Sequence, residues 1–368
     1  MFETRIAADQ LTVAAVEGFP PAIDVLAGGH PGGYGFLRRA WYAADGKPGR
    51  TLLLQSGGPD GAPLAAIPTV PFGPPLAGAR KVPGCYWPLR SALIAPECDV
   101  FELAHALGHG AARSLGPVWR VGPARADDPA LDLLIAAAQL ANWTVIAKAT
   151  GTSWVIDLDA ARSAGWPRSS TGRRLRQYWH KLETLGTPRW RHVRGAAWNA
   201  GVLQDLGRIE AQSWIGRTTD GTGAKFLTPD QRARWTTVLA DPVLAKALCA
   251  TILMLDERPI AFSFDLDDGP VRYGIAGSYA EDLRQAGIGK LANYRAMEDA
   301  IAAGQSTLDM GQGDTGYKAG MGAVAGYRLL DLLFVRNRSI ARLIARAWGE
   351  ALPPPAPIPL HEVAHGRG

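Results

Sequence analysis

The hydrophobic and polar positions of this chain repeat with a period of two in some segments and of about 3.6 in others. The first period is typical of strands and the second of amphipathic helices. Asp99 and either Asp127 or Asp128 are the expected helix caps in the first half. The patterns there predict, in order, strands over residues 51–55, 62–70 and 81–94, a helix over 99–114, a strand over 118–122, a helix over 128–140 and strands over 143–148 and 153–157.

The same two periods return after residue 198. The two halves share the order hairpin, further strand, helix, strand, which indicates duplicated α/β folds, although no identical residues repeat. The second half is predicted to hold helices over 198–214, 229–239 and 242–248, strands over 250–255, 259–266 and 271–278, a helix over 289–303, strands over 306–310 and 327–335 and a basic helix over 339–348. We expect that last helix to dock through four apolar residues, Ile340, Leu343, Ile344 and Trp348.

The changes of pattern divide the chain into five parts. The predicted parts are an irregular arm over residues 1–35, an N-terminal domain over 36–160, a basic linker helix region over 161–197, a C-terminal domain over 198–338, and a C-terminal helix with a proline-rich tail over 339–368. In the linker, Glu183 is the single acid among many arginines, and apolar residues recur at helical spacing. Such a helix could meet RNA, an anionic glycan or a phosphorylated cofactor. The alternative is a helix that packs between domains and holds its arginines in water.

Composition narrows the class of protein. The chain has 368 residues, of which 47% are hydrophobic and 20% charged, as in a globular protein. A net charge of +5 is too small to indicate a dedicated nucleic-acid binder. The three cysteines, Cys85, Cys98 and Cys249, form no C-x-x-C pair, which argues against disulfides and structural zinc. No signal peptide or membrane-spanning segment is visible, so we expect a cytoplasmic protein without a membrane span.

Several motif matches fail in their context. His361-Glu362-Val363-Ala364-His365 has the letters of a zinc site but follows a proline run near the end of the sequence, so no metal is expected. The run from Gly311 to Gly316 matches G-x-G-x-x-G, but no helix pattern follows it. A nucleophilic serine elbow is absent, so covalent catalysis is not suggested.

Two segments between residues 278 and 318 remain as candidates for a site. Arg284-x-x-Gly287-x-Gly289 stands between a predicted strand and a predicted helix, where free backbone N–H groups can receive phosphate. Ordinary helix capping is the alternative interpretation of these glycines. The second segment is the strand that carries Asp309 into an acid-containing turn before Tyr317 and Lys318.

These residues resemble a known family. The R-x-x-G-x-G between strand and helix resembles the acyl-CoA pyrophosphate loop of the GNAT acyltransferase superfamily. The run Leu308-Asp309-Met310-Gly311-x-Gly313-Asp314-x-x-Tyr317-Lys318 is similar to the signature of acetyltransferase-like proteins associated with bacterial cellulose and exopolysaccharide synthesis. Glu210-x-x-Ser213-Trp214 and the arginine-rich helix near Arg173 are also similar to that group. The resemblance covers roughly residues 40–335.

The resemblance implies an α/β protein with tandem GNAT folds, each a mixed sheet flanked by helices, related to the Fem-type aminoacyl transferases. The second copy would hold acetyl-CoA or another acyl-CoA, with the thioester along the strand at 271–278. The chain departs from the family pattern directly after the Tyr-Lys pair, where a bulky aromatic residue is expected and Ala319, Gly320 and Met321 stand instead. We therefore expect its acceptor pocket to differ from that of the family.

The implied roles are as follows. The pyrophosphate would be held by Arg284, Gly287, Ile288, Gly289 and Lys290. Asp314 would be the base or would orient the acceptor, and Tyr317 would be the acid. Trp214, Asp309 and Lys318 would lie on the substrate side, although Asp309 could equally be a structural partner of Lys318.

Three functions follow from this resemblance. The first is acyl transfer from acyl-CoA to a sugar, amino sugar or small amine, in cellulose or exopolysaccharide production and with a polysaccharide synthase complex as a partner. The second is aminoacyl transfer from charged tRNA, the one function here with a nucleic-acid partner, which the basic helix would serve. The third is a non-catalytic scaffold with the same fold.

Overall fold

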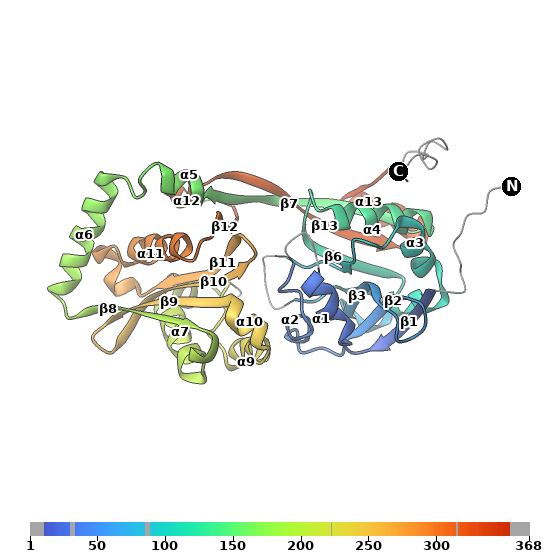
Figure 1. The fold of residues 1–368 in the computed structure, drawn as a ribbon, viewed down its shortest axis with the longest axis horizontal. Helices are drawn as coiled ribbons and strands as arrows, with labels where there is room; N and C mark the ends of the chain where they lie inside the picture. Colours follow the sequence, from blue (N-terminus) through green and yellow to red (C-terminus); the bar gives the residue numbers. More distant parts are fainter. Residues whose placement is uncertain (1–10, 30–33, 85–88, 222, 314–315, 354–368) are drawn as a thin grey trace.

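Two long strands join two lobes of mixed sheet and helix (Figure 1). The structure is a computed structural model that describes residues 11–29, 34–84, 89–221, 223–313 and 316–353. The N-terminal lobe is built from residues 11–149 and 329–351, and the C-terminal lobe from residues 150–328. The α/β class with a mixed sheet flanked by helices is therefore confirmed.

The N-terminal lobe contains a strand and a helix inside the segment expected to be an irregular arm. Two of its helices begin at predicted caps, because Asp99 and Glu102 form a capping box and Asp128 accepts from the N–H of Ala130. Its elements are β1 (Leu11–Glu17), α1 (Ala22–Gly29), α2 (Arg39–Ala43), β2 (Arg50–Ser56), β3 (Pro63–Pro71), η2 (Pro75–Ala77), β4 (Arg80–Lys81), β5 (Leu93–Ile94), α3 (Val100–Gly108), η3 (Gly110–Leu115), β6 (Val118–Arg125), α4 (Pro129–Leu140), α13 (Arg338–Trp348), β14 (Glu350–Ala351) and the outer parts of β7 (Thr144–Asp157) and β13 (Val324–Val335).

The C-terminal lobe holds the remaining elements. It contains the basic helix predicted near Arg173, and a strand missed by the sequence patterns follows that helix. The elements are α5 (Leu158–Ser163), α6 (Ser169–Glu183), β8 (Pro188–Arg194), η4 (Gly195–Ala197), α7 (Ala200–Gln212), α8 (Trp214–Thr218), α9 (Pro229–Leu239), α10 (Pro242–Ala247), β9 (Leu248–Leu255), β10 (Arg258–Asp268), β11 (Val271–Tyr279), η5 (Glu281–Ala286), α11 (Ile288–Ala302), β12 (Thr307–Gln312) and α12 (Tyr317–Met321).

One strand order runs through both lobes, β1-β2-β3-β4-β6-β13-β7-β12-β11-β10-β9-β8. Strand β7 pairs with β13 from Thr144 to Val155, and its last residues also pair with β12, so β7 belongs to both lobes. The two strands predicted over 143–148 and 153–157 are therefore one strand. The predicted run over 81–94 was largely wrong, because only its ends form the short strands β4 and β5; residues 85–88 lie outside the described part.

Helices cover both faces of the C-terminal sheet, and the core continues between the lobes. Ala261 packs with Ile288 of α11 on one face of β10, whereas Phe264 packs against Trp235 of α9 on the other face, with ring centroids 4.7 Å apart. The ring of Trp235 also lies 6.1 Å from that of Trp41, which belongs to the N-terminal lobe. The lobes therefore share one hydrophobic core.

The helix α13 docks on the sheet through two of the four predicted residues, Ile344 and Trp348. Ala341, Ile344, Ala345 and Trp348 pack against the ends of β7 and β13. Ile340 and Leu343 point away and are 43% and 66% exposed, so their predicted docking role was wrong. Among the described residues, none of the helices has the length and apolar character that crossing a membrane requires.

Candidate active site

The strands β11 and β12 separate after a short parallel pairing. They pair at Val271, Arg272 and Tyr273, opposite Thr307, Leu308 and Asp309, and not beyond. From Gly274 to Tyr279, β11 keeps only β10 as a neighbour, so one edge of its backbone is left without a strand partner. This opening offers main-chain donors and acceptors to an extended ligand.

A β-bulge lies at the start of the opening. Phe264 pairs with Ala276 and Asp265 with Gly274, so Ile275 is an extra residue without a partner on β10. A bulge leaves the backbone of the extra residue unpaired and turns the strand locally. Beneath it Asp265 is buried, and burial raises the pKa of its carboxyl to about 7 while Arg272 and the Ser263 hydroxyl lower it.

The predicted phosphate loop closes the far end of this opening. After β11 the chain makes the short 3₁₀ helix η5, and Gly287 then caps α11 with φ of +69° and without a side-chain acceptor. The N–H groups of the first turn, from Ile288 to Lys290, therefore have no capping side chain, as expected of an anion site. Arg284 and Lys290 are exposed beside them.

Both glycines of the loop are also needed for packing. A Cβ at Gly287 would lie 2.6 Å from the ring of Tyr178 on α6, and one at Gly289 would lie 2.7 Å from the ring of Tyr279. Lys181, also on α6, donates to the Gln285 carbonyl at 2.9 Å. The basic helix thus lies directly on the loop, and its exposed Arg173, Arg174 and Arg176 have no carboxylate partner within the described chain.

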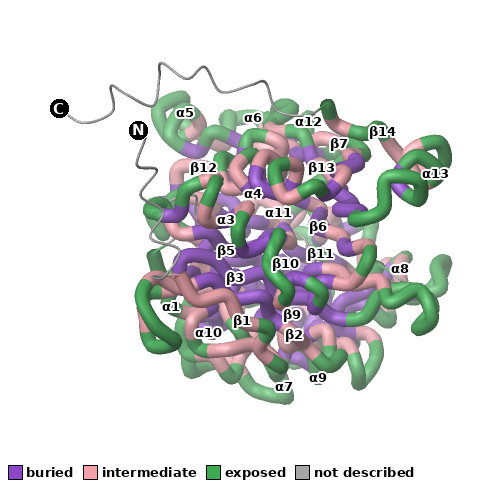
Figure 2. Tube along the Cα trace, turned by 90° about the vertical axis from the view of Figure 1, so that its right-hand side faces the viewer, coloured by how far each residue is buried: buried purple, intermediate pink, exposed green. Residues whose placement is uncertain are grey.

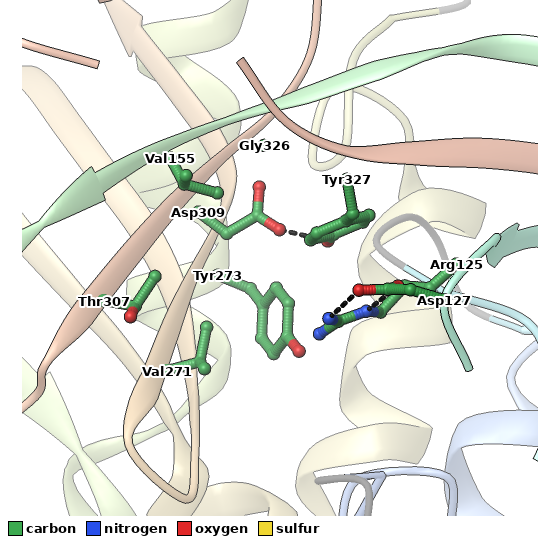
Figure 3. A pocket seen from close by; sticks show the side chains of 9 residues that line it. All are labelled: Arg125, Asp127, Val155, Val271, Tyr273, Thr307, Asp309, Gly326 and Tyr327. Carbon is green, nitrogen blue, oxygen red and sulfur yellow. Dashed lines mark hydrogen bonds and ion pairs between the residues drawn. The ribbon is translucent and has the colours of Figure 1, made fainter. Parts of the chain in front are cut away.

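The near end of the opening leads into a cavity of about 430 Å³ between the lobes, which we call the interlobe cavity. Figure 3 shows its polar groups converging, with Asp309 toward Tyr327 and the Tyr273 hydroxyl toward Arg125. It is lined by Arg125, Asp127, Val155, Val271, Tyr273, Thr307, Asp309, Gly326 and Tyr327.

Asp309 is the most heavily hydrogen-bonded group of the cavity. Its carboxylate accepts from the Ser153 hydroxyl, from the Gly311 N–H at 2.8 Å and from the Tyr327 hydroxyl. These donors come from β7, β12 and β13, so the carboxylate is fixed by three strands. Burial, followed by the charge of Asp309, raises the pKa of Tyr327 far above its ordinary value and keeps this hydroxyl protonated.

Arg125 forms the opposite wall. It makes a bidentate ion pair with Asp127 at 3.0 and 2.9 Å and lies over the Tyr327 ring, 4.3 Å from its centroid. Burial raises the pKa of Tyr273, and nearby Arg125 opposes that rise. The cavity therefore presents two neutral tyrosine hydroxyls beside a fixed carboxylate, groups suited to a polar acceptor.

The sequence-predicted residues fall into separate places. Asp314 lies outside the described residues. Tyr317 is 47% exposed at the start of α12, whereas the Lys318 ammonium is buried and donates to the carbonyls of Gly311 and Gln312 at 3.0 and 3.1 Å. Asp309 enters the interlobe cavity, while the phosphate loop lies at the other end of β11.

The segment around Trp214 lies near the phosphate loop. Arg258 joins Gln212 at the end of α7 to Asp282 on η5, and Trp214 starts the next helix with 52% of its surface exposed. Glu210, from the same motif, is buried and its carboxylate accepts from the N–H groups of Lys225 and Phe226. Glu210 therefore orders the loop before α9.

The sequence patterns missed most of the cavity wall. Arg125, Tyr273 and Tyr327 stand at or near strand ends and are separated by long stretches of chain. A signal existed only for Tyr327, which follows the Asp309 to Lys318 motif within the predicted last strand. Among the described residues, no group of three or more His, Cys, Asp or Glu is placed to hold a metal ion.

Residues 169–319 match the family model of the acetyltransferase (GNAT) domain. A search of curated protein sequences found no match. The matched segment holds α6, the sheet from β8 to β12 and α11, which are the elements that form the opening and the phosphate loop. The match supports the prediction of a GNAT-type acyltransferase.

Solved structures with a similar fold cover both lobes. FemX is 12% identical with a TM-score of 0.56, over 89% of this chain and 99% of that chain. L-PGS from Bacillus licheniformis is 15% identical with a TM-score of 0.53, over 89% and 98%. The C-terminal domain of a protein assigned as a lysylphosphatidylglycerol synthetase from Agrobacterium fabrum is 13% identical with a TM-score of 0.50, over 77% and 84%. At these identities the likeness shows the fold, and it agrees with the predicted Fem-like architecture.

Proposed function

We propose that the chain transfers an acyl group from acyl-CoA to an amine or hydroxyl of an acceptor bound in the interlobe cavity. One observation carries this proposal: β11 leads from an uncapped helix N-terminus at Gly287 to the cavity at Tyr273, with an open edge between them. A phosphate-bearing carrier and its acceptor would meet at opposite ends of one strand. The distance along the strand from Tyr273 to Tyr279, six residue steps, is about 20 Å.

In this proposal the residues of the loop hold the diphosphate of the carrier. The N–H groups from Ile288 to Lys290 would donate to it, and Arg284 and Lys290 would add charge-assisted contacts. The unpaired backbone at the Ile275 bulge is the candidate donor to the thioester oxygen as negative charge develops there. Bound acyl-CoA would supply the activated acyl group.

The acceptor would lose its proton through Tyr327 and Asp309. The tyrosine hydroxyl already donates to the carboxylate, so its oxygen can accept a proton from the acceptor while its own proton passes to Asp309. The new bond forms between the acceptor nitrogen or oxygen and the acyl carbon, and the carbon–sulfur bond breaks. The thiolate takes up the released proton as it leaves.

The acceptor class follows from the cavity wall. The polar groups of the wall suit a hydroxylated or amine-bearing molecule more than an apolar one. These groups are the hydroxyls of Tyr273 and Tyr327, the Asp309 carboxylate and the Arg125–Asp127 pair. We therefore propose a sugar, amino sugar or small amine. We also propose that the protein acts in cellulose or exopolysaccharide production, with a polysaccharide synthase complex as a partner. This part of the proposal rests on the sequence resemblance alone.

Calorimetric titration with acetyl-CoA tests the carrier site. We expect the wild type to bind, and the double variant Arg284→Glu with Lys290→Glu to bind at least about tenfold more weakly, because two charge-assisted contacts are lost. Arg234→Glu, an exposed arginine on α9, is the matched control and should bind as the wild type does. Absence of binding to the wild type, or equal binding by the double variant, would reject the site.

A second function is favoured by α6. Its exposed Arg173, Arg174 and Arg176 lie on the helix that covers the loop, which suits the phosphates of a charged tRNA. Tight tRNA binding that falls steeply with salt and is lost when these three arginines become glutamine would favour aminoacyl transfer. Binding of neither acyl-CoA nor tRNA would favour a scaffold.

A further inference from the structure

The outward surface of α13 combines arginines with exposed apolar side chains. Leu343 is 66% exposed and Ile340 is 43% exposed, although both belong to a well-formed helix. Figure 2 shows α13 projecting from the body of the molecule. The helix thus keeps a large part of its apolar surface in water, which a soluble helix ordinarily avoids.

The exposed residues fall into two adjacent rows. Arg338, Arg342 and Arg346 recur every four residues and form one row. Ile340, Leu343 and Ala347 recur at three and four residues and form the second row. Because Ala341, Ile344 and Trp348 hold the opposite side against the sheet, both rows face outward.

The charge of this surface is uniform. Between Arg336 and Gly349 the chain has four arginines and no acidic residue. Arg336 lies over the Trp143 ring and Arg338 contacts the Asn142 amide, and within the described residues none of the four arginines pairs with a carboxylate. By contrast, Arg125 and Arg272 are paired with neighbouring aspartates.

We propose that α13 binds the surface of an anionic lipid bilayer. The helix would lie parallel to the membrane, with Ile340 and Leu343 among the headgroups and the arginine row on lipid phosphates. A nucleic acid would contact the arginines but leave the apolar row in water. Pairing of two copies through α13 would bring eight arginines together without an acid between them, which like-charge repulsion opposes. This proposal does not depend on the proposed acyl transfer.

Co-sedimentation of the full chain with lipid vesicles tests it. Vesicles of phosphatidylglycerol and phosphatidylcholine in equal parts should bind the wild type, and vesicles of phosphatidylcholine alone should not. Each arginine near an anionic membrane surface strengthens binding about fivefold. The partition coefficient of the double variant Arg342→Gln with Arg346→Gln onto anionic vesicles should therefore be about 25-fold lower than that of the wild type. Leu343→Ser should also weaken binding, because it removes the apolar contact.

A matched variant on other helices separates this site from general charge. Arg113→Gln with Arg234→Gln removes the same charge from exposed positions on η3 and α9 and should leave vesicle binding unchanged. Each changed side chain is exposed, so we expect the thermal unfolding transition of every variant to match that of the wild type. A matching transition shows that the variant is folded. The proposal is overturned if anionic vesicles fail to bind, if both double variants lose binding equally, or if Leu343→Ser abolishes a dimer seen by sedimentation velocity.

Discussion

Asp309 and Tyr327 form a pair in the C-terminal lobe, directly beside its boundary with the N-terminal lobe. Asp309 belongs to β12, while Tyr327 lies on β13 and contacts Arg125 of the N-terminal lobe through its ring. Since Ser153 and the Gly311 N–H also hold the carboxylate, neither partner can turn freely. Such fixed polar groups in a cavity are the arrangement expected of groups that handle protons.

Removal of the Tyr327 hydroxyl tests the proton route. We expect Tyr327→Phe to lower turnover about 100-fold, the lower end for loss of a general acid or base, and to leave acetyl-CoA binding unchanged. Tyr317→Phe is the comparison, because Tyr317 was the acid implied by the family resemblance and lies exposed on α12. A larger loss in Tyr317→Phe than in Tyr327→Phe would reverse the assignment.

Asp268 links pH to stability. Burial raises the pKa of its carboxyl to about 7, while the Gly35 N–H lowers it. The folded chain therefore holds this proton more tightly than the unfolded chain between about pH 4 and pH 7. The free energy of unfolding that this group contributes is highest at low pH and falls as the pH rises through 7.

The variant Asp268→Asn removes that titration. Relative to the wild type, it should gain about 2 to 3 kcal/mol in the free energy of unfolding between pH 5 and pH 8. Urea unfolding at both pH values measures this difference. Asp265, whose pKa is also raised to about 7, makes its own contribution to the pH dependence of stability. Because both proteins contain Asp265, that contribution cancels in the difference between the variant and the wild type. An equal difference at both pH values would contradict the buried carboxyl.

Local sequence could identify only part of the site. The loop at Gly287 and the acid at Asp309 stand in continuous motifs, so spacing was enough to single them out. Tyr273, Tyr327 and Arg125 meet only because β7 and β13 cross between the lobes, and no local pattern encodes that crossing. Tertiary pairing decides which polar residues line the cavity.

At the scale of elements, α6 and α11 are packed together around two glycines. The first turn of α11 lies between the rings of Tyr178 and Tyr279, at distances that exclude a Cβ at Gly287 or Gly289. Glycine is therefore required by packing as well as by any bound phosphate. A large side chain at Gly287 would disturb both, so it cannot by itself test ligand binding.

A pair of alanine variants measures the packing. Gly287→Ala should lower the free energy of unfolding by about 2 to 4 kcal/mol. The loss has two causes, because the alanine must adopt a positive φ and its Cβ would lie too close to the Tyr178 ring. Gly304→Ala is the control, since Gly304 has φ of +79° and no atom within 4 Å of the added Cβ, so it should cost only about 1 kcal/mol. Equal losses in the two variants would show that Tyr178 does not restrict the loop.

Elements with strong local signals were predicted, and those set by tertiary contacts were not. Capped helices such as α3, and the hairpin of β2 and β3, were found because caps and turns are local. The edge strand β8 was missed because its alternating arginines resemble a solvated linker. For α13, docking was predicted correctly for Ile344 and Trp348 but not for Ile340 and Leu343, because apolar periodicity alone does not say which apolar residues face the sheet.

At the scale of the whole molecule, the lobes share strands and core. β7 and β13 run through both lobes (Figure 1). The Trp41 and Trp235 rings meet where the lobes touch. The ring of Phe36 likewise lies 6.0 Å from that of Tyr273. A continuous sheet with a shared core favours unfolding as one unit.

Trp41→Ala tests this coupling. The variant removes a fully buried ring and should lower the free energy of unfolding by about 3 to 5 kcal/mol. Tryptophan fluorescence and far-ultraviolet circular dichroism should then follow one shifted transition in denaturant. Two separated transitions, with only one of them moved, would show that the lobes unfold independently.

The central claim is that the carrier site and the acceptor site lie at opposite ends of β11 and act separately. Asp309→Asn tests it most directly, with acetyl-CoA binding followed by calorimetry and product formation followed by mass spectrometry over a panel of amines and amino sugars. We predict binding within about threefold of the wild type and turnover lowered at least about 100-fold. Turnover equal to that of the wild type, or loss of acetyl-CoA binding together with turnover, would contradict the claim.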